Sequence, residues 1–301
     1  MSNRVVVVFG ATRGIGREIA IKFSTHHWNV VVSGKTVEDA GEPHLQGTIH
    51  SVAREIQEAQ AGNAAPGVKA IAVKCDVRNA ADVSSVFEQA LRQFGRIDCV
   101  VYNAGAILWN KVADTSLKRF ELMIDINLRG FYAVIQQAIP LFTKQQFGRI
   151  ITIAPPIYSR FTRGKTPYAA TKYGMSSLVI GLGHEWADTP FAISGLWPAT
   201  GIESAVTIKL KSPPHLLRTA DVMAEACYRI ALDEPRNVNG LLLIDEDYLR
   251  SKGVADAYFQ SVRCDPAREP PRMMPKRFPN LMVDEEMGEV FAANSLARSK
   301  L

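Results

Sequence analysis

The sequence predicts an α/β fold: a doubly wound parallel sheet with helices on both faces, in a single domain followed by a C-terminal extension. Two features support this. Short apolar runs alternate with segments whose apolar residues recur at helical spacing, a pattern typical of strands joined by crossover helices. The first run, at residues 5–9, leads straight into a glycine-rich turn and then a helical pattern, as expected for the first strand of a nucleotide-binding sheet.

Seven apolar runs have the length and composition of buried strands. We expect strands near residues 4–9, 28–33, 69–74, 97–102, 148–154, 191–197 and 240–244. Helical patterns fill most of the gaps, with long ones at 117–145 and 168–186. Because strands and helices alternate, the strands should run parallel.

Length and composition agree with one large domain. The chain has 301 residues, of which 47% are hydrophobic, enough for one α/β core without a second domain. We place the domain at residues 1–245 and the extension at 246–301. The formal net charge of +5 is small and scattered, so nucleic acid is not an expected partner.

The distribution of cysteine, histidine and apolar residues argues against several other classes of protein. The four cysteines lie far apart without a C-x-x-C spacing, and the six histidines add no ligand spacing. We therefore expect reduced thiols and no metal site. No apolar run reaches the roughly eighteen residues of a membrane span, and the N-terminus has the pattern of a strand rather than a secretory signal. These features predict a soluble protein.

The glycine-rich turn predicts a dinucleotide site. Its glycines lie between a strand and a helix, where unpaired N–H groups at the helix N-terminus favour a pyrophosphate. The spacing Gly-x-x-x-Gly-x-Gly departs from the usual Gly-x-Gly-x-x-Gly, but strand, turn and helix come in the required order. The residues expected to contact the cofactor here are Gly10, Thr12, Arg13, Gly14, Ile15 and Gly16.

A second motif predicts proton transfer. Tyr168 and Lys172 are four residues apart in a helical pattern, so the phenol and the ammonium share one helix face. A tyrosine normally titrates near pH 10, and an adjacent cation favours its phenolate. Such a pair could exchange a proton with a substrate oxygen near neutral pH.

With these motifs and Asn103-Ala104-Gly105 in this order, the chain resembles the short-chain dehydrogenase/reductase superfamily over roughly residues 4–245. The resemblance implies a Rossmann-type fold, a nicotinamide cofactor, and a homodimer or homotetramer formed through the segments 117–145 and 168–186. It implies that Tyr168 is the general acid or base, that Lys172 lowers its pKa and holds the nicotinamide ribose, and that Asn127 supports a proton relay.

The resemblance also assigns further cofactor contacts. Asp76 matches an adenine-contacting aspartate, and residues 103–105 match a cofactor-facing turn. The implied contacts outside the glycine turn are Asp76, Val77, Asn103, Ala104, Gly105, Tyr168, Lys172 and Ser204. For Ser204, a plain helix cap is an equally good interpretation.

Charge near the second strand favours NADP(H) over NAD(H). An acidic side chain at the end of that strand would hold a ribose 2′-hydroxyl and repel a 2′-phosphate. The strand instead ends Ser33-Gly34-Lys35, and Arg13 lies in the glycine turn, so two cations flank the expected 2′ position. Both could also be ordinary solvated surface cations.

The chain departs from the superfamily pattern at the active site. The serine expected thirteen residues before the tyrosine is Pro155, which has neither a side-chain donor nor a backbone N–H. The substrate oxygen would depend on Tyr168 and on a substitute hydroxyl such as Ser159 or Thr152. Losing one such donor can cost roughly a hundredfold in rate, so activity on ordinary alcohols should be poor.

The Pro155-Pro156 pair, the segment 43–49 and Leu196-Trp197-Pro198 are similar to a narrower branch of the superfamily, that of hydroxysteroid dehydrogenase-like protein 2. Members of this branch are linked with peroxisomes and lipid metabolism, and animal members carry an added sterol-carrier domain for which this chain has no room. The final Ser299-Lys300-Leu301 matches the address read by the peroxisomal import receptor. We therefore expect a peroxisomal protein.

Together these features predict an NADP(H)-dependent oxidoreductase acting on a hydrophobic carbonyl, alcohol or conjugated enone. Residues 203–218 fall where the family carries a substrate lid, and their apolar residues suit a hydrophobic substrate, although an ordinary amphipathic helix explains them equally well. Because of Pro155, one alternative is a cofactor-binding isomerase, cyclase or scaffold without redox chemistry. Another is a non-catalytic subunit that stabilises a catalytic relative.

Overall fold

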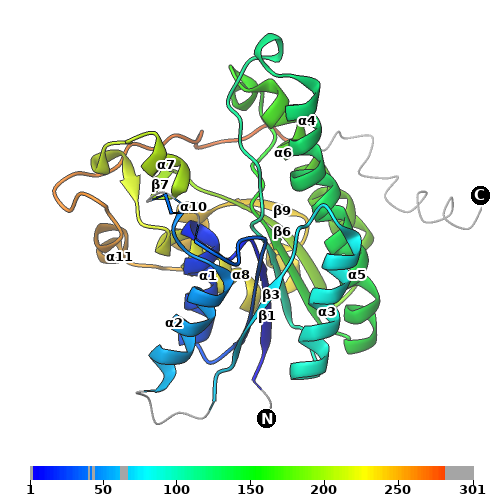
Figure 1. The fold of residues 1–301 in the computed structure, drawn as a ribbon. Coiled ribbons are helices and arrows are strands. Elements are labelled where there is room, and N and C mark those ends of the chain that lie inside the picture. The colour runs from blue at the N-terminus through cyan, green and yellow to red at the C-terminus, as the bar shows by residue number, and fades with distance from the viewer. Residues whose placement is uncertain (1–2, 40, 43–44, 62–66, 282–301) are drawn as a thin grey trace, which may run out of the picture.

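The computed structural model describes residues 3–39, 41–42, 45–61 and 67–281. A parallel sheet of seven strands lies at its centre, with helices on both faces, as predicted (Figure 1). Each expected strand is present, with its ends within two residues of the prediction. The strands are β1 (Val5–Phe9), β2 (Asn29–Gly34), β3 (Ala70–Lys74), β4 (Cys99–Tyr102), β5 (Gly148–Thr152), β6 (Phe191–Trp197) and β9 (Leu241–Ile244).

The order of the strands places a crevice at the centre of the sheet. The strands run β3-β2-β1-β4-β5-β6-β9, so the chain moves outward from β1 to β3 and then returns to β4 on the other side of β1. Phe9 at the end of β1 is paired in register with Tyr102 at the end of β4. Ligands of such sheets bind at the carboxyl ends of the strands where the order reverses.

An apolar core lies on each face of the sheet, between the strands and the helices that cover them. One core joins the sheet to α1 (Gly14–Thr25), α2 (Ile49–Ala61) and α8 (Asp221–Leu232). The other joins the opposite face to α3 (Ala80–Phe94), α5 (Gly130–Gln145) and α6 (Thr166–Glu185). The strands carry near-continuous buried β-branched residues because both faces are covered.

The helical pattern predicted at 117–145 is interrupted near its middle. It begins as α4 (Leu117–Met123), passes through a π-helical turn at Ile124–Arg129, and continues as α5. The Tyr102 hydroxyl donates to the Ile126 carbonyl within this turn. Such π-turns are rare and often occur at functional sites, and this one carries Asn127.

Shorter elements follow β6. Residues 201–218 contain the paired strands β7 (Gly201–Ile202) and β8 (Leu217–Arg218), with the short helix α7 (Ala205–Lys209) between them. Helix α9 (Pro235–Val238) precedes β9, and the predicted extension contains α10 (Asp245–Ser251) and α11 (Asp256–Ser261). Residues 262–281 then lead back across the carboxyl ends of the strands (Figure 1).

Other predictions made from composition concern the cysteines, metals and membranes. All four cysteines are free, as predicted. Among the described residues, no cluster of three or more His, Cys, Asp or Glu side chains could hold a metal ion. No helix in the described part of the chain is long and apolar enough to cross a membrane.

Two glycines of α6 provide a matched test of this packing. A Cβ at Gly183 would lie 2.3 Å from the Gly240 Cα, whereas one at Gly181 would have no neighbour within 4 Å. Gly183→Ala should therefore destabilise the fold by about 1–3 kcal/mol through overpacking. Gly181→Ala should stabilise it by about 0.5–1 kcal/mol through helix propensity. Urea unfolding of both variants measures the contrast, and equal stabilities would show that α6 does not pack tightly on the turn before β9.

Candidate active site

The glycine turn after β1 is packed against the turn after β4. Gly10 has φ +80°, and a Cβ there would lie 2.7 Å from the Ala104 N. A Cβ at Gly16 would lie 2.2 Å from the Gly10 carbonyl oxygen. That carbonyl also accepts a hydrogen bond from the Asn103 side-chain amide at 2.9 Å. Only glycine fits these two positions, and the close approach fixes the crevice floor.

Helix α1 begins at Gly14, directly above this floor, and presents its N-terminus to the crevice. Gly14 has φ +51°, in the left-handed region, and lies beside Ser204, the residue before α7. The first N–H groups of a helix have no intrahelical acceptor and favour an anion. The turn and helix start therefore fit the pyrophosphate of a dinucleotide. The predicted residues Thr12, Ile15, Ala104 and Gly105 belong to these same two turns.

Arg13 precedes α1 and reaches toward the end of β2. Its guanidinium donates to the Thr36 hydroxyl at 3.3 Å and to the Gly47 carbonyl at 3.0 Å, while its Nε is buried without a hydrogen-bond partner. Burial lowers the pKa of Arg13, and a nearby Asp39 partly offsets that effect. An anion at this position would satisfy the unpaired N–H.

Asp39 was not anticipated from the sequence. Its carboxylate accepts from the Gly47 N–H at 2.9 Å, so it braces the loop that lies over the glycine turn. A Cβ at Gly47 would lie 2.3 Å from the Thr12 carbonyl oxygen, which shows how closely the loop covers the turn. Its position depends on the fold of the 45–49 segment, which periodicity does not reveal.

Lys35 and Asp76 meet at the ends of β2 and β3. The Lys35 ammonium lies 3.4 Å from the Asp76 carboxylate, and 68% of the Lys35 side chain is exposed. Arg78 donates to the same carboxylate at 2.9 Å. Hydrogen bonds from Arg78, the largest cause, lower the pKa of Asp76, and the charge of Lys35 acts in the same direction. Asp76 and its neighbour Val77 therefore lie beside the cation predicted to mark the 2′ position.

Asn127 links the site to α6. Its side-chain oxygen accepts from the Ala106 N–H at 2.8 Å, and its amide donates to the Ala106 carbonyl at 3.0 Å and to the Thr171 hydroxyl at 2.9 Å. The π-turn places this fully buried amide between the β4 turn and the helix that carries Tyr168. A Cβ at Gly105 would lie 3.4 Å from the Asn127 oxygen and 3.9 Å from the Lys172 Nζ. The structure therefore brings the Asn127 side-chain oxygen and the Lys172 ammonium together beside Gly105.

Tyr168 and Lys172 lie on the first turns of α6 and face inward. They are 3% and 4% exposed. The Lys172 ammonium donates to the Ile153 carbonyl at 2.8 Å and approaches the Met175 sulfur at 3.6 Å. No carboxylate among the described residues pairs with it. A buried lysine with no counter-charge is costly.

Burial shifts the pKa of both groups away from their charged forms. It lowers the pKa of Lys172 from 10.5 to about 7 and raises that of Tyr168 above its usual value. That Lys172 lowers the pKa of Tyr168 therefore stays a prediction. The cause in both cases is desolvation, which disfavours the charged form of each group.

Pro155 follows β5 and is buried near this pair. Its carbonyl accepts from the Ser176 hydroxyl at 2.7 Å, which ties it to α6 one turn beyond Lys172. Of the two proposed substitutes for the serine, Thr152 is fully buried with its hydroxyl directed at the Tyr102 carbonyl, 3.3 Å away. Ser159 is exposed in a short turn. The Thr152 hydroxyl is thus already engaged, and Ser159 lies at the surface.

Ser204 acts as a helix cap in the structure. It precedes α7, and its side chain accepts from the Thr207 N–H while the Thr207 hydroxyl accepts from the Ser204 N–H, forming a capping box. It also lies beside Gly14. The cap interpretation is therefore shown, and contact with a cofactor stays a prediction.

An apolar cluster surrounds Tyr168 and was not predicted. Its buried members are Met123, Tyr158, Phe161, Tyr168 and Ala169, and Leu108, Phe120, Trp197, Met274 and Phe278 pack against them. They come from six separate parts of the chain, so no local pattern in the sequence could group them. The cluster makes the surroundings of the phenol strongly apolar.

Known proteins show the same organisation. The family model described as short chain dehydrogenase matches residues 4–213. Hydroxysteroid dehydrogenase-like protein 2 from Homo sapiens is 35% identical over 258 residues, covering 84% of this chain and 59% of the relative, and the Mus musculus protein is 36% identical, covering 84% and 50%. The chain therefore spans about three-fifths or less of the length of these relatives.

Solved structures agree with the fold. A short chain dehydrogenase from Mycobacterium thermoresistibile is 32% identical and superposes with a TM-score of 0.78, covering 92% of this chain and 96% of that chain. A metagenomic short-chain oxidoreductase in complex with NADP is 23% identical with a TM-score of 0.63, covering 81% and 96%. The second likeness concerns the fold alone.

The buried lysine makes stability depend on pH. The folded-state pKa of Lys172 lies below that of the unfolded chain, so the folded protein binds fewer protons between about pH 7 and pH 10.5. Stability should rise with pH through that window. The effect of Lys172→Met on unfolding free energy should therefore be more favourable at pH 6.5 than at pH 9.5, by on the order of 3 kcal/mol.

Urea unfolding at the two pH values measures this difference, with Lys118→Met on exposed α4 as the control. A Lys172→Met effect that is the same at both pH values would mean that burial does not lower the pKa of Lys172 in the folded protein.

Proposed function

The chain belongs to the short-chain dehydrogenase/reductase family, and on that basis we propose that it is an NADP(H)-dependent oxidoreductase acting on a hydrophobic carbonyl, alcohol or conjugated enone. One observation carries the proposal. Lys172 is buried beside Tyr168 and Asn127 with no carboxylate partner among the described residues. A fold gains nothing in stability from such a lysine, so a bound group must give it a role.

The crevice suits a nicotinamide dinucleotide along its whole length. Gly10 and Gly16 leave no room for side chains, the start of α1 faces the crevice, and Arg13 has an unsatisfied buried N–H. Lys172 at the other end offers N–H donors to ribose hydroxyls. A reduced nicotinamide held there would supply the hydride.

Each residue of the site then has a defined task in carbonyl reduction. Tyr168 donates its phenolic proton to the substrate oxygen as the carbon receives the hydride, so a hydride and a proton together convert the carbonyl to an alcohol. Lys172 in its charged form stabilises the phenolate that remains. Asn127 holds the Ala106 backbone and Thr171, which positions the β4 turn against α6.

A second donor for the substrate oxygen is needed because Pro155 provides none. Tyr158 belongs to the same apolar cluster as Tyr168, and its hydroxyl donates to the Met274 sulfur at 3.2 Å, with Arg160 also close enough to interact with it. A thioether is a weak acceptor, so this hydroxyl could turn to a substrate oxygen at little cost. Tyr158 is therefore a better candidate than the exposed Ser159.

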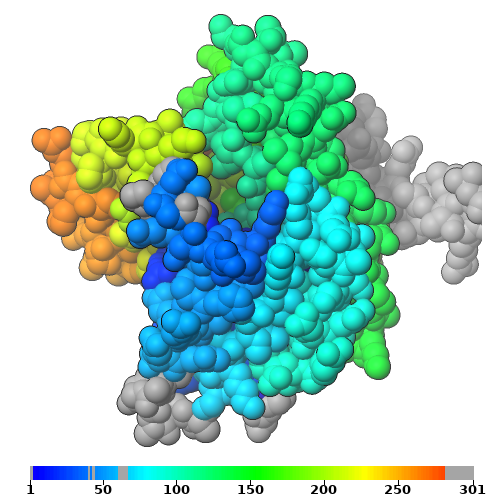
Figure 2. Space-filling model, viewed as in Figure 1, coloured from blue at the N-terminus to red at the C-terminus, as the bar shows by residue number. Residues whose placement is uncertain are grey.

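The walls of the site favour an apolar substrate. Figure 2 shows a recess between the part of the chain around α4, the part around α7 and the segment after β2. Exposed apolar side chains occur in two of these parts of the chain: Ile107 and Trp109 after β4, and Ile208 and Leu210 in and just after α7. Together with the apolar cluster around Tyr168, they suit a lipid-derived molecule.

The preference for NADP(H) rests on Arg13 and Lys35. Arg13 is the stronger of the two because it is partly buried and lacks one partner, whereas Lys35 is largely exposed and already faces Asp76. Asp39 works against the preference, since a carboxylate near Arg13 could hold a ribose 2′-hydroxyl instead. Its hydrogen bond to Gly47 occupies one of its oxygens.

Pro155 supports one competing function. A cofactor-binding protein without redox activity, such as an isomerase, a cyclase or a scaffold, would tolerate the loss of the serine. The buried Tyr168 and Lys172 favour the redox proposal, because a scaffold has no need of two desolvated proton-transfer groups.

Location and assembly are further parts of the proposal. Ser299-Lys300-Leu301 lies outside the described residues, and the peroxisomal location follows from that tripeptide alone. We also propose a homodimer or homotetramer formed through α5 and α6. Analytical ultracentrifugation showing only a monomer at micromolar concentration would exclude that assembly.

Titration with NADPH and with NADH tests the cofactor preference. The protein should bind NADPH at least tenfold more tightly than NADH, because Arg13 and Lys35 attract the 2′-phosphate. Arg13→Ala with Lys35→Ala should remove most of that difference and leave NADH binding nearly unchanged. Asp39→Asn removes the negative charge near Arg13 and should therefore have the opposite effect, strengthening NADPH binding. Tighter binding of NADH than of NADPH by the wild type would contradict the preference, and no binding of either would overturn the proposed function.

A reporter fusion tests the location independently. A fluorescent protein carrying residues 282–301 at its C-terminus should collect in peroxisomes, because the import receptor reads the terminal tripeptide. The same fusion without Leu301 should remain diffuse. A diffuse signal from both fusions would rule out this signal.

A further inference from the structure

The C-terminal residues after α11 form a strap that returns to the active site. We call residues 269–278 the C-terminal strap. They lie beyond the stretch matched by the family model, which ends at residue 213. In Figure 1 this orange to red segment crosses from the α7 and α11 side of the molecule toward α6. Three sets of contacts fix its path.

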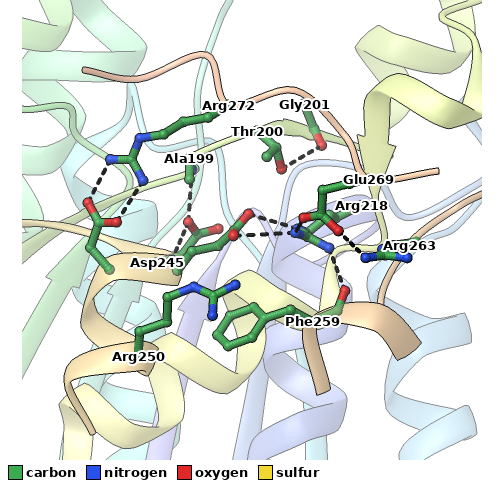
Figure 3. Close-up of polar contacts among 12 residues, drawn as sticks. Ala199, Thr200, Gly201, Arg218, Asp245, Arg250, Phe259, Arg263, Glu269 and Arg272 are labelled. Carbon is green, nitrogen blue, oxygen red and sulfur yellow. Dashed lines mark hydrogen bonds and ion pairs between the residues drawn. The ribbon is translucent and has the colours of Figure 1, made fainter. Parts of the chain in front are cut away.

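The first anchor is a buried ion-pair network (Figure 3). Arg218, on β8, is fully buried and pairs with Glu246 of α10 at 2.7 Å and with Glu269 at the start of the strap. Arg263 pairs with the same Glu269, and the Arg218 guanidinium also donates to the Phe259 carbonyl. Removing the partners of such a buried arginine strongly destabilises a fold. These ion pairs therefore hold the start of the strap in place.

The second anchor joins the strap to the loop after β6. The Met273 and Met274 N–H groups donate to the Ala199 carbonyl at 2.8 and 3.2 Å. The Ala199 N–H in turn donates to the Asp245 carboxylate at 2.8 Å. Arg272 forms a two-pronged ion pair with Asp247, at 2.6 and 2.7 Å, and donates to the Met274 carbonyl at 2.8 Å. These contacts fix the backbone on both sides of Met274.

The third set faces the apolar cluster. The Met274 sulfur accepts from the Tyr158 hydroxyl, and the Phe278 ring packs edge-on against the Tyr158 ring with centroids 5.4 Å apart. Both residues contact the cluster that contains Tyr168. Arg160 donates to the Met273 carbonyl at 2.8 Å, while 50% of the Met273 side chain is exposed. Met274 therefore points inward and its neighbour points outward.

From these contacts we propose that the C-terminal strap is a fixed wall of the substrate site, and that Met274 and Phe278 set how long an apolar chain the site accepts. The inference rests on the proposed function, since it places the substrate against Tyr168. It goes beyond that function by assigning specificity to residues 245–281, outside the nucleotide-binding part.

Binding of straight-chain alkanamides, from hexanamide to dodecanamide, tests the wall without requiring turnover. Their amide carbonyl resists hydride, and calorimetry can follow them with and without NADPH. In the wild type, affinity should rise about three- to fourfold per methylene until the chain meets the strap, and then level off. Met274→Ala and Phe278→Ala should move this limit outward by one to two methylenes, so that the longest amides gain about tenfold.

Met273→Ala is the matched control, because Met273 makes the same backbone contact with Ala199 but its side chain points outward. Its binding series should coincide with that of the wild type. Arg272→Gln, which removes the clamp on Asp247, should move the limit in the same direction as Met274→Ala.

The proposal is overturned if Met274→Ala and Phe278→Ala give the same series as Met273→Ala, or if no alkanamide binds the wild type. Failure of the proposed function appears separately, as absence of NADPH binding in the same titrations. If the chain-length limit moves in the strap variants but NADPH does not bind, the proposed role of the strap is supported and the proposed reductase function is excluded.

Discussion

The burial of Tyr168 and Lys172 without a counter-charge is the constraint on which the rest of the site depends. Desolvation pushes both groups toward neutrality, raising the pKa of the phenol and lowering that of the ammonium to about 7. The surrounding contacts make that burial tolerable, since the Ile153 carbonyl accepts from Lys172. The cost in stability is comprehensible only if a bound cofactor restores the charge of Lys172, which would then lower the pKa of Tyr168.

Pro155 lies where we expected the family's serine, and the side chains around Tyr168 are largely apolar. The described surroundings of the phenol include many aromatic and aliphatic side chains, and among them the Tyr158 hydroxyl donates to a weak acceptor, the Met274 sulfur. The strap reinforces that character because it adds Met274 and Phe278 to the cluster. On our proposal, such a site gains its binding energy from buried apolar area and therefore binds lipid-like molecules better than small polar alcohols.

The sequence predicted the sheet well because its signals are local. Buried strands are continuous apolar runs, and the Tyr168–Lys172 pair is visible from four-residue spacing. Features that depend on contacts between distant segments could not be read in this way. Asp39 acquires its place from the loop at Gly47, and Met274 and Phe278 reach Tyr158 across more than a hundred residues. The rise in the pKa of Tyr168 could not be read from the sequence for the same reason, because burial is a property of the whole fold.

The central claim is that burial lowers the pKa of Lys172 to about 7, and that a bound cofactor restores the charge of this lysine. Calorimetric titration of NADPH at pH 8, in buffers with different ionisation enthalpies, measures the protons exchanged on binding. The account predicts that the wild type takes up part of a proton, because ribose oxygens and phosphates favour the charged form of a lysine whose pKa is about 7. The Lys172→Met variant should take up none. Binding without proton uptake in the wild type, or equal uptake in both proteins, would contradict the account.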